Sequence, residues 1–308
     1  MKRIFFYESL ILMIFYDYEL IEKTGLTLLF NIIINQKIDW KWRRILINHD
    51  VGEGYNEEDL SKPNEQRGKE ESGIVIVGAS HAGVGFADHM RKNGFVGSLT
   101  LIDRQKGGPM ERPPLSKAFL LETVEKVNPM FLLKRGKWYK EGKVALKHGT
   151  IVSKIDIESK CLILENDENI KYDKLVLATG AVPRSLPATE GVSNVFVLRQ
   201  PDDAVAIRTK ARKAKSIIII GGGYIGLEVA ATLCQMGLSV SVIEAADRLL
   251  ARVASPSVAR LLAELHRTHG VSVYTGIGVE KIIKESGSFE GVTLSNGTIL
   301  KGDMLVVG

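Results

Sequence analysis

The sequence predicts an α/β protein that contains two similar strand–helix–strand units, and three observations support this fold class. Two short runs of β-branched residues, Ile74–Val77 and Ser216–Ile220, are typical of buried parallel strands. A glycine-rich turn and a helical stretch follow each run directly. A second apolar strand then follows each helical stretch, at Ser98–Ile102 and Ser239–Ile243, and an acidic residue closes it. This order is that of two parallel βαβ units.

The length and composition agree with a folded chain of ordinary type. Its 308 residues suggest about two domains. Hydrophobic residues make up 45% and charged residues 25%, so there is enough apolar material for a core. The 2 cysteines exclude a disulfide scaffold and a cysteine-rich metal site. The net charge of +5 is scattered, with few aromatic residues among the charges, which disfavours nucleic-acid binding.

Residues 1–72 differ from the rest of the chain. Their apolar start is interrupted by Glu8 and Asp17 and has no small-residue cleavage site, so it does not fit a signal peptide. The uncharged runs Ser9–Tyr16 and Gly25–Gln36 are shorter than the ~20 apolar residues that span a bilayer. We expect a poorly ordered extension and linker of unknown role in a cytoplasmic protein, with peripheral membrane contact as the disfavoured alternative.

The first unit carries a variant of the dinucleotide-binding fingerprint. Gly78 allows a sharp turn out of the strand, and Gly83 allows the following helix, predicted over Val84–Lys92, to pack against it. Ser80 replaces the middle glycine and is still small enough for the backbone to approach a pyrophosphate. Asp103 closes the second strand, where it can accept hydrogen bonds from a ribose.

The second unit carries the full fingerprint. Gly221, Gly223 and Gly226 occupy the three glycine positions, and a helix is predicted over Tyr224–Met236. Glu244 closes the second strand. One such match is weak, because glycine-rich turns also join strands to helices for structural reasons alone. Two matches, each with the strand, helix and acid in place, predict two Rossmann-like three-layer nucleotide-binding domains.

Glu244 also bears on the choice of nicotinamide cofactor. A carboxylate at this position accepts a hydrogen bond from a ribose 2′-hydroxyl and repels a 2′-phosphate. The sequence therefore favours NADH over NADPH, although Arg248 lies close enough in sequence to keep NADPH open.

Three local motifs resemble those of one flavoprotein branch. Gly78–Gly83 is similar to the FAD fingerprint of NADH-dependent ferredoxin and rubredoxin reductases, Arg112–Lys117 to their stretch beside the isoalloxazine, and Tyr172–Ala181 to the strand and turn that close their first FAD segment. These are FAD enzymes with two dinucleotide-binding domains, related to the pyridine nucleotide-disulfide oxidoreductases. The resemblance covers about residues 73–308.

The resemblance implies roles for individual residues. For FAD it implies the adenosine-side residues Gly78, Ser80, Gly83 and Asp103, the flavin-side residues Arg112 and Lys117, and Thr179, Gly180 and Arg184 along the pyrophosphate. For NADH it implies Gly221, Gly223, Tyr224, Ile225, Gly226 and Glu244, with Tyr224 over the nicotinamide pocket.

The resemblance also pairs Lys117 with Glu228 near the flavin N5, as catalytic residues. A nearby cation stabilises the negative charge that hydride transfer places on a flavin. A buried lysine in turn needs a carboxylate partner to stay charged. The alternative is a helix-surface glutamate and a loop lysine that never meet.

The remaining reactive side chains do not suggest another chemistry. Cys161 lies in an alternating stretch and Cys234 on a predicted helix, and neither matches a redox position, so thiol chemistry is disfavoured. His266 and His269 lie on a helix predicted over Ser257–His269 and indicate a solvated face rather than a zinc site. Electrons from a flavin would therefore go to a carrier, a quinone or oxygen.

These observations predict three segments: an extension at 1–72, a first FAD-binding segment at 73–200 and an NADH-binding domain at 201–308, with a β-meander over Lys143–Ile170. In the family that the chain resembles, a second FAD segment and a C-terminal domain follow. We therefore expect a C-terminally truncated chain with an open flavin site, weak FAD binding and exposed apolar surface.

The function implied is an FAD-dependent oxidoreductase that takes hydride from NADH and passes single electrons to a ferredoxin- or rubredoxin-like carrier. Two alternatives stay open at this point. One is a non-catalytic nucleotide-binding fragment of such a reductase, and the other is a slow NADH oxidase.

Overall fold

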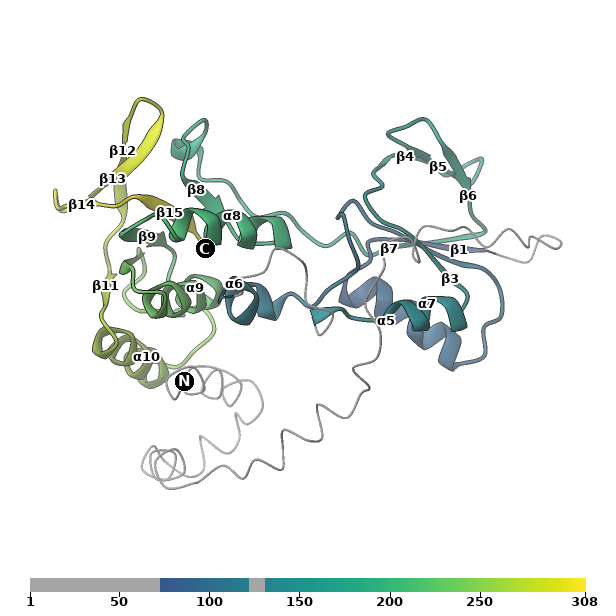
Figure 1. The fold of residues 1–308 in the computed structure, drawn as a ribbon, viewed down its shortest axis with the longest axis horizontal. Helices are drawn as coiled ribbons and strands as arrows, with labels where there is room; N and C mark the ends of the chain where they lie inside the picture. The colour runs from purple at the N-terminus through teal and green to yellow at the C-terminus, as the bar shows by residue number, and fades with distance from the viewer. Residues whose placement is uncertain (1–72, 122–130) are drawn as a thin grey trace, which may run out of the picture. The chain divides into compact units, whose positions relative to one another are not determined.

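The computed structural model describes residues 73–121 and 131–308, which form two parallel β-sheets with their covering layers (Figure 1). The extension predicted over residues 1–72 lies outside the described residues. Among those described, no helix combines the length and the apolar character that crossing a bilayer requires.

The first sheet has four strands in the order β3-β2-β1-β7, all parallel. Its strands are β1 (Ile74–Val77), β2 (Leu99–Ile102), β3 (Val144–Lys147) and β7 (Lys174–Leu177). The central strand β1 pairs with β2 from Ile74 opposite Leu99 and with β7 from Ile74 opposite Lys174. The predicted β-branched run is therefore the buried middle of the sheet.

Different layers cover the two faces of this sheet. Helices α5 (His81–Lys92) and α7 (Gly136–Glu141) lie on one face, and the antiparallel strands β4 (Val152–Asp156), β5 (Cys161–Leu164) and β6 (Asn169–Lys171) lie on the other (Figure 1). Along β1, Ile74 and Ile76 pack toward the helices, whereas Val75 packs with Leu162 of β5. Successive side chains of a strand point to opposite faces of the sheet, so this single apolar run contributes to two separate cores.

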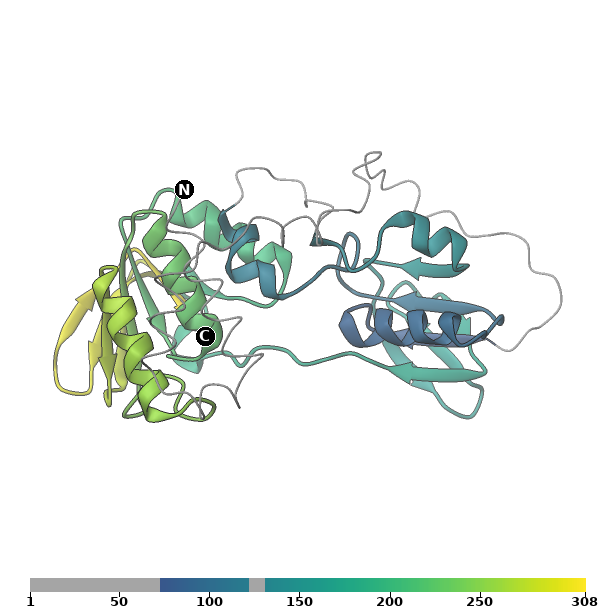
Figure 2. The ribbon, with the colours of Figure 1, turned by 90° about the horizontal axis from the view of Figure 1, so that it is seen from below.

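The second sheet has five parallel strands in the order β11-β10-β9-β15-β8. Its strands are β8 (Val195–Val197), β9 (Ser216–Ile220), β10 (Ser239–Glu244), β11 (Val271–Thr275) and β15 (Met304–Val307). Helices α8 (Pro201–Ala211), α9 (Tyr224–Gln235) and α10 (Pro256–Thr268) connect them, and Figure 2 shows the helical side. The antiparallel strands β12 (Val279–Glu285), β13 (Ser288–Leu294) and β14 (Ile299–Lys301) cover the opposite face.

The predicted β-meander is corrected at its start. Val144–Lys147 is not the first strand of the meander but the edge strand β3 of the parallel sheet, where it pairs with β2. Val144 and Leu146 are buried there, so their alternating pattern fits either kind of strand. The meander itself begins at Val152. The corresponding antiparallel layer of the second sheet was not predicted.

Three segments carry contacts across the expected boundary at residue 200. Strand β8, which precedes that boundary, pairs with β15 in the second sheet. The short 3₁₀ helix η1 (Pro113–Ser116) and α6 (Ala118–Leu121) pack against α8 and α9 of the second unit. The third segment, the 3₁₀ helix η3 (Pro187–Thr189), contacts β12.

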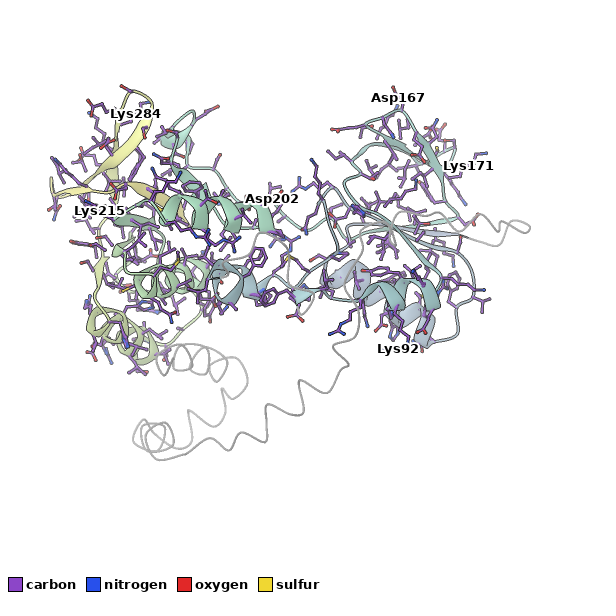
Figure 3. The ribbon with its side chains drawn as sticks, viewed as in Figure 1. Lys92, Asp167, Lys171, Asp202, Lys215 and Lys284 are labelled. Atoms are coloured by element: carbon purple, nitrogen blue, oxygen red, sulfur yellow. The ribbon has the colours of Figure 1, made fainter. Side chains whose placement is uncertain are left out.

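Charged residues lie at the ends of several elements, such as Lys92 as the last residue of α5 and Lys215 before β9 (Figure 3). At the start of β9, the Asp303 carboxylate accepts hydrogen bonds from the backbone N–H groups of Lys215, at 2.7 Å, and Ser216, at 2.8 Å. These two bonds lower the pKa of Asp303 below its ordinary value of 3.8. Asp303 therefore ties the entry of β15 to the entry of β9.

We expect an Asp303→Asn variant to be less stable than the parent chain at neutral pH, by at most about 1 kcal/mol because the side chain is exposed. A carboxylate whose folded-state pKa is lowered stabilises the fold above its unfolded pKa and loses that effect as the pH falls through the folded value. Urea unfolding of both chains should therefore show a difference at pH 7 that shrinks below about pH 4. A difference that stays constant with pH would contradict this role.

Candidate functional site

Both glycine-rich turns adopt a backbone that only glycine tolerates. Gly78 has φ of 104° and Gly221 has φ of 114°, in the region that side chains rarely adopt. A Cβ at Gly78 would lie 2.2 Å from the Ala178 carbonyl oxygen, and one at Gly221 would lie 2.4 Å from the Gly308 carbonyl oxygen. Each turn therefore passes directly against the end of a neighbouring parallel strand.

The third glycine of each fingerprint packs a helix against its turn. A Cβ at Gly83 would lie 1.9 Å from the Gly78 carbonyl oxygen, and one at Gly226 would lie 2.2 Å from the Gly221 carbonyl oxygen. The first turns of α5 and α9 thus approach their strands more closely than any side chain would permit.

The middle position of each turn leaves room for a ligand. Ser80 and Gly223 are the N-cap residues of α5 and α9, and neither helix has a side-chain cap. The first N–H groups of a helix have no partner within the helix, so they are available to an anion, which the helix dipole also favours. A Cβ at Gly223 would have no atom within 4 Å. This open cradle of backbone donors fits the pyrophosphate of a dinucleotide.

The two acids, Asp103 and Glu244, bind the glycine-rich turns. Asp103 accepts hydrogen bonds from the backbone N–H of Ala79 at 2.6 Å and of Gln105 at 2.8 Å. Glu244 does the same for Gly222 at 2.7 Å and for Ala246 at 2.8 Å. Each carboxylate oxygen has a second lone pair that stays available to a ribose hydroxyl. The two units therefore repeat one arrangement of turn and acid.

Arg248 is turned toward its own loop. Its guanidinium donates to the carbonyls of Ala254, at 2.8 Å, and Ala251, at 2.7 Å. This arrangement favours the NADH interpretation that Glu244 suggested, because the guanidinium is already engaged.

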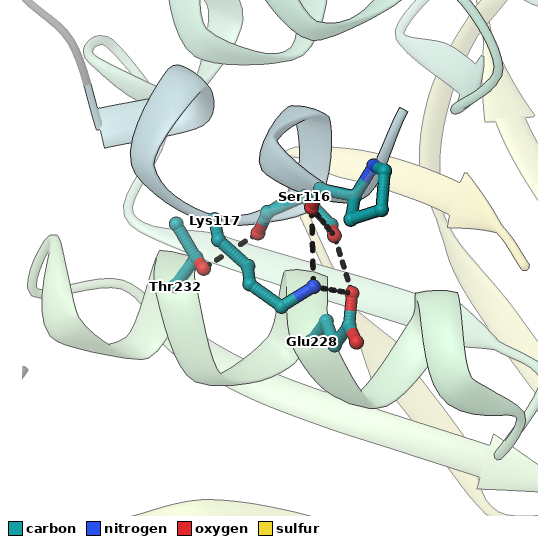
Figure 4. A network of polar contacts seen from close by, with 5 residues as sticks. Ser116, Lys117, Glu228 and Thr232 are labelled. Atoms are coloured by element: carbon teal, nitrogen blue, oxygen red, sulfur yellow. Dashed lines mark hydrogen bonds and ion pairs between the residues drawn. The ribbon is translucent and has the colours of Figure 1, made fainter. Parts of the chain in front are cut away.

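Lys117 and Glu228 meet, as Figure 4 shows. The Lys117 Nζ lies 2.6 Å from Glu228 Oε2 and 3.1 Å from the Pro113 carbonyl oxygen. The two side chains are only 22% and 11% exposed, so little water screens the pair. Lys117 follows η1, whereas Glu228 lies on the helix of the second fingerprint. The pair thus joins the two regions that the sequence assigned to the flavin and to NADH.

Two further members of this network were missed at the sequence level. Ser116 donates its hydroxyl proton to Glu228 Oε2, and its carbonyl accepts a hydrogen bond from Thr232 Oγ1 at 2.7 Å (Figure 4). Ser116 belongs to the motif Arg112–Lys117, but the sequence suggested roles only for the two charged residues of this motif. Thr232 lies four residues after Glu228, a spacing that places both on one helix face.

A second arginine accompanies Arg112. Arg112 donates from Nη1 to the carbonyl of Arg199, and burial, together with the nearby Arg199 charge, lowers the pKa of Arg112 below its ordinary value. A Cβ at Gly180 would lie 3.2 Å from Arg199 Nη2. These guanidinium groups make a cationic cluster near the end of β7 that fits an anionic ligand. Arg199 carries no motif of its own, so the sequence did not single it out.

Other predicted residues lie at exposed positions. Thr179, Gly180 and Arg184 follow β7 on the surface. Leu177, at 59%, and Val182, at 67%, are exposed in the same segment, which agrees with the expected apolar surface. On α9, Tyr224 is half-buried and Ile225 is 44% exposed.

The remaining candidates are the two cysteines and the two histidines at the end of α10. Cys161 and Cys234 are both free thiols, and burial raises the pKa of Cys234, which disfavours its reactive thiolate. The solvated face predicted for α10 is wrong for His266, which is 2% exposed and whose pKa burial lowers to about 4. In the described part of the chain, no three His, Cys, Asp or Glu side chains are grouped so as to hold a metal ion.

Comparison with known proteins gives concordant results. The sequence profile of the family described as pyridine nucleotide-disulphide oxidoreductase matches residues 72–308. The chain is 37% identical over 236 residues to the 3-phenylpropionate/cinnamic acid dioxygenase ferredoxin–NAD(+) reductase component of Photorhabdus laumondii, and 38% identical over 238 residues to a rubredoxin-NAD(+) reductase of Pseudomonas putida. Each alignment covers 76% of this chain, and respectively 59% and 61% of the relative.

Solved structures similar to this chain include proteins of the same kind. The ferredoxin reductase of the CYP199A2 system from Rhodopseudomonas palustris matches with a TM-score of 0.73 and 34% identity, over 77% of this chain and 58% of that one. The covalent putidaredoxin reductase–putidaredoxin complex matches with a TM-score of 0.72 and 34% identity, over 78% and 58%. The chain therefore spans about three-fifths of the length of the proteins it matches.

Proposed function

We propose that this chain, which belongs to the pyridine nucleotide-disulphide oxidoreductase family, is an FAD-dependent reductase that takes hydride from NADH and passes single electrons to a ferredoxin- or rubredoxin-type protein. One observation carries the proposal most strongly. The Lys117–Glu228 ion pair links the segment expected beside the flavin to the helix expected over NADH. A protein with two independent nucleotide sites would not need an ion pair between these two segments.

The first unit supplies the residues for FAD. The turn from Gly78 to Ser80 and the start of α5 would hold its pyrophosphate, and Asp103 would accept a bond from its ribose. Arg112 would lie beside the flavin, and Arg199, close to Gly180, would add positive charge toward the phosphates. These roles use the free donors of a helix start and a cationic cluster, both suited to an anionic cofactor.

The second unit supplies the residues for NADH. The turn from Gly221 to Gly223 and the start of α9 would hold the pyrophosphate, with Glu244 at the ribose. Tyr224 and Ile225, on the first turn of α9, would flank the nicotinamide.

The protein contributes electrostatics and orientation, while bound FAD supplies the conversion of a two-electron hydride into single electrons. Lys117 would place a positive charge beside the flavin, which would stabilise the negative charge that hydride transfer adds. Glu228 holds the Lys117 ammonium group in place, in a pair whose side chains are only 22% and 11% exposed. Ser116 fixes the carboxylate oxygen that both donors share.

The acceptor is proposed from the relatives, whose names include ferredoxin, rubredoxin and rhodocoxin reductases. The raised thiol pKa of Cys234 supports a carrier rather than a disulfide as acceptor. A cytoplasmic location, where such carriers receive electrons from NADH, is part of the same proposal.

An anaerobic absorption experiment tests the proposal. The purified chain is supplied with FAD, freed of excess cofactor and titrated with NADH, and its visible flavin band is followed. Retained FAD that NADH bleaches and that an added ferredoxin or rubredoxin reoxidises is the expected result. FAD that is not retained, or is retained but not bleached, would overturn the proposed activity for this chain and favour the nucleotide-binding fragment. Bleached flavin that only oxygen reoxidises would favour the oxidase.

The cofactor choice yields a further prediction. We expect Glu244→Gln to lower the preference for NADH over NADPH by about tenfold, because the amide no longer repels a 2′-phosphate. The glutamine oxygen can keep one of the two backbone bonds, so the turn should persist. Fluorescence titration with each nucleotide measures the ratio. Asp247→Asn, which removes an exposed neighbouring charge, is the matched control and should leave it unchanged.

A further inference from the structure

Thr232 uses its hydroxyl differently from the other threonines in the described α-helices. Thr209 on α8 and Thr268 on α10 each donate to the carbonyl four residues earlier in their own helix, at 2.7 Å and 2.8 Å. This local bond is the usual one for a helical threonine. Thr232 on α9 instead donates to the carbonyl of Ser116, which lies 116 positions earlier in the chain.

Both partners of this bond are buried. Thr232 is 6% exposed and Ser116 is 4% exposed, so water does not replace either group while η1 stays packed on α9. A buried hydroxyl and a buried carbonyl each need a partner, and here each satisfies the other. The bond is therefore part of the contact between the two segments rather than a surface detail.

The bond acts on Lys117 through the backbone. The Ser116 carbonyl belongs to the same planar peptide group as the nitrogen and Cα of Lys117, so a hydrogen bond that fixes this oxygen also restrains the position from which the Lys117 side chain starts. On the same face of α9, one turn earlier, Glu228 accepts the Ser116 hydroxyl proton and the Lys117 ammonium proton (Figure 4). One helix face thus holds the main chain before the lysine and the end of its side chain.

We propose that Thr232 is a positioning residue, which orients the Ser116–Lys117 peptide so that the Lys117 ammonium is held at Glu228. Its consequence for hydride transfer rests on the proposed function above. Thr232 itself acts only through Ser116.

The first test uses the chain without cofactors. Reductive methylation followed by mass spectrometry reports how readily the Lys117 amine reacts, and hydrogen exchange reports the protection of residues 113–121. Valine is nearly equal in size to threonine but lacks the hydroxyl donor. We expect Thr232→Val to raise the rate of Lys117 methylation and the rate of hydrogen exchange in residues 113–121, each about tenfold. Thr232→Ser, which restores a hydroxyl, and Thr268→Val, which removes a hydroxyl bonded within its own helix, should react as the parent chain does.

The second test adds FAD and separates binding from hydride transfer. Thr232→Val should slow flavin reduction at saturating NADH about tenfold, leave the NADH dissociation constant unchanged, and be rescued by serine. Wild-type Lys117 reactivity in Thr232→Val, or a serine variant that behaves like valine, would overturn the proposal. If valine prevents folding, Thr232→Ala replaces it. If NADH does not reduce the parent chain, the proposed function fails while the methylation result still decides the role of Thr232.

Discussion

A Gly226→Ala variant is expected to lose about 3 kcal/mol of unfolding free energy and its NADH binding together. The added Cβ would lie 2.2 Å from the Gly221 carbonyl oxygen and 3.3 Å from the Ile219 side chain. Neither neighbour can yield easily, because Gly221 is held by a 2.8 Å hydrogen bond from its N–H to Ile243 O and Ile219 is fully buried. The helix must therefore move away from the strand, which carries its N–H groups away from the phosphate position.

Gly223→Ala is the matched control, since it adds the same methyl group three residues earlier. Gly223 has φ of −80°, which alanine adopts freely, and a Cβ there meets no atom within 4 Å. We expect this chain to unfold at the parent urea concentration and yet to bind NADH at least tenfold more weakly, because the methyl group occupies the space proposed for the pyrophosphate. Circular dichroism and NADH fluorescence titration measure the two effects separately.

The pair of variants is informative in every combination. Normal NADH binding by Gly223→Ala would place the pyrophosphate elsewhere, and parent-like stability of Gly226→Ala would show that α9 does not depend on its close approach to β9. Equal loss of stability in both would contradict the difference in surroundings seen here.

The same turns explain why much of the fold was predictable. Each βαβ unit has local requirements: a turn with positive φ after the strand, and a small residue where the helix approaches that strand. These requirements are visible in the sequence as glycines, namely Gly78, Gly83, Gly221 and Gly226. The sequence pattern was ambiguous where two kinds of strand share the same alternation of buried and exposed residues. Val144–Lys147 alternates buried and less buried residues, as a meander strand would, and only its pairing with β2 reveals a parallel edge strand.

The site was predictable only where a motif named its residues. The sequence could name Lys117 and Glu228 because each lies in a recognisable motif, and the structure brings them together. Thr232 and Arg199 carry no local signal, because their roles come from contacts with residues 116 and 87 positions away. Contacts of this separation depend on how the segments pack, which a single sequence does not display.

Lys117→Met is expected to slow the reduction of bound flavin by NADH about 100-fold, with little change in NADH affinity. Methionine keeps an unbranched side chain that is one atom shorter, and it removes the charge that would stabilise the flavin as hydride arrives. Lys117→Arg should recover only part of the rate, because its planar guanidinium does not reproduce both the 2.6 Å contact to Glu228 and the 3.1 Å contact to Pro113 O. Anaerobic stopped-flow absorbance measures the rate.

Lys92→Met supplies the control for removing a lysine from an ion pair. Lys92 also contacts a carboxylate, Asp88, at 2.8 Å, but its side chain is 71% exposed, against 22% for Lys117. An exposed pair contributes about 1 kcal/mol at most, so this variant should fold and reduce flavin as the parent does. If Lys117→Met also matched the parent rate, the Lys117–Glu228 pair would be a structural link between two nucleotide-binding units. A selective loss would instead make that link the place where the charge of the transferred hydride is balanced.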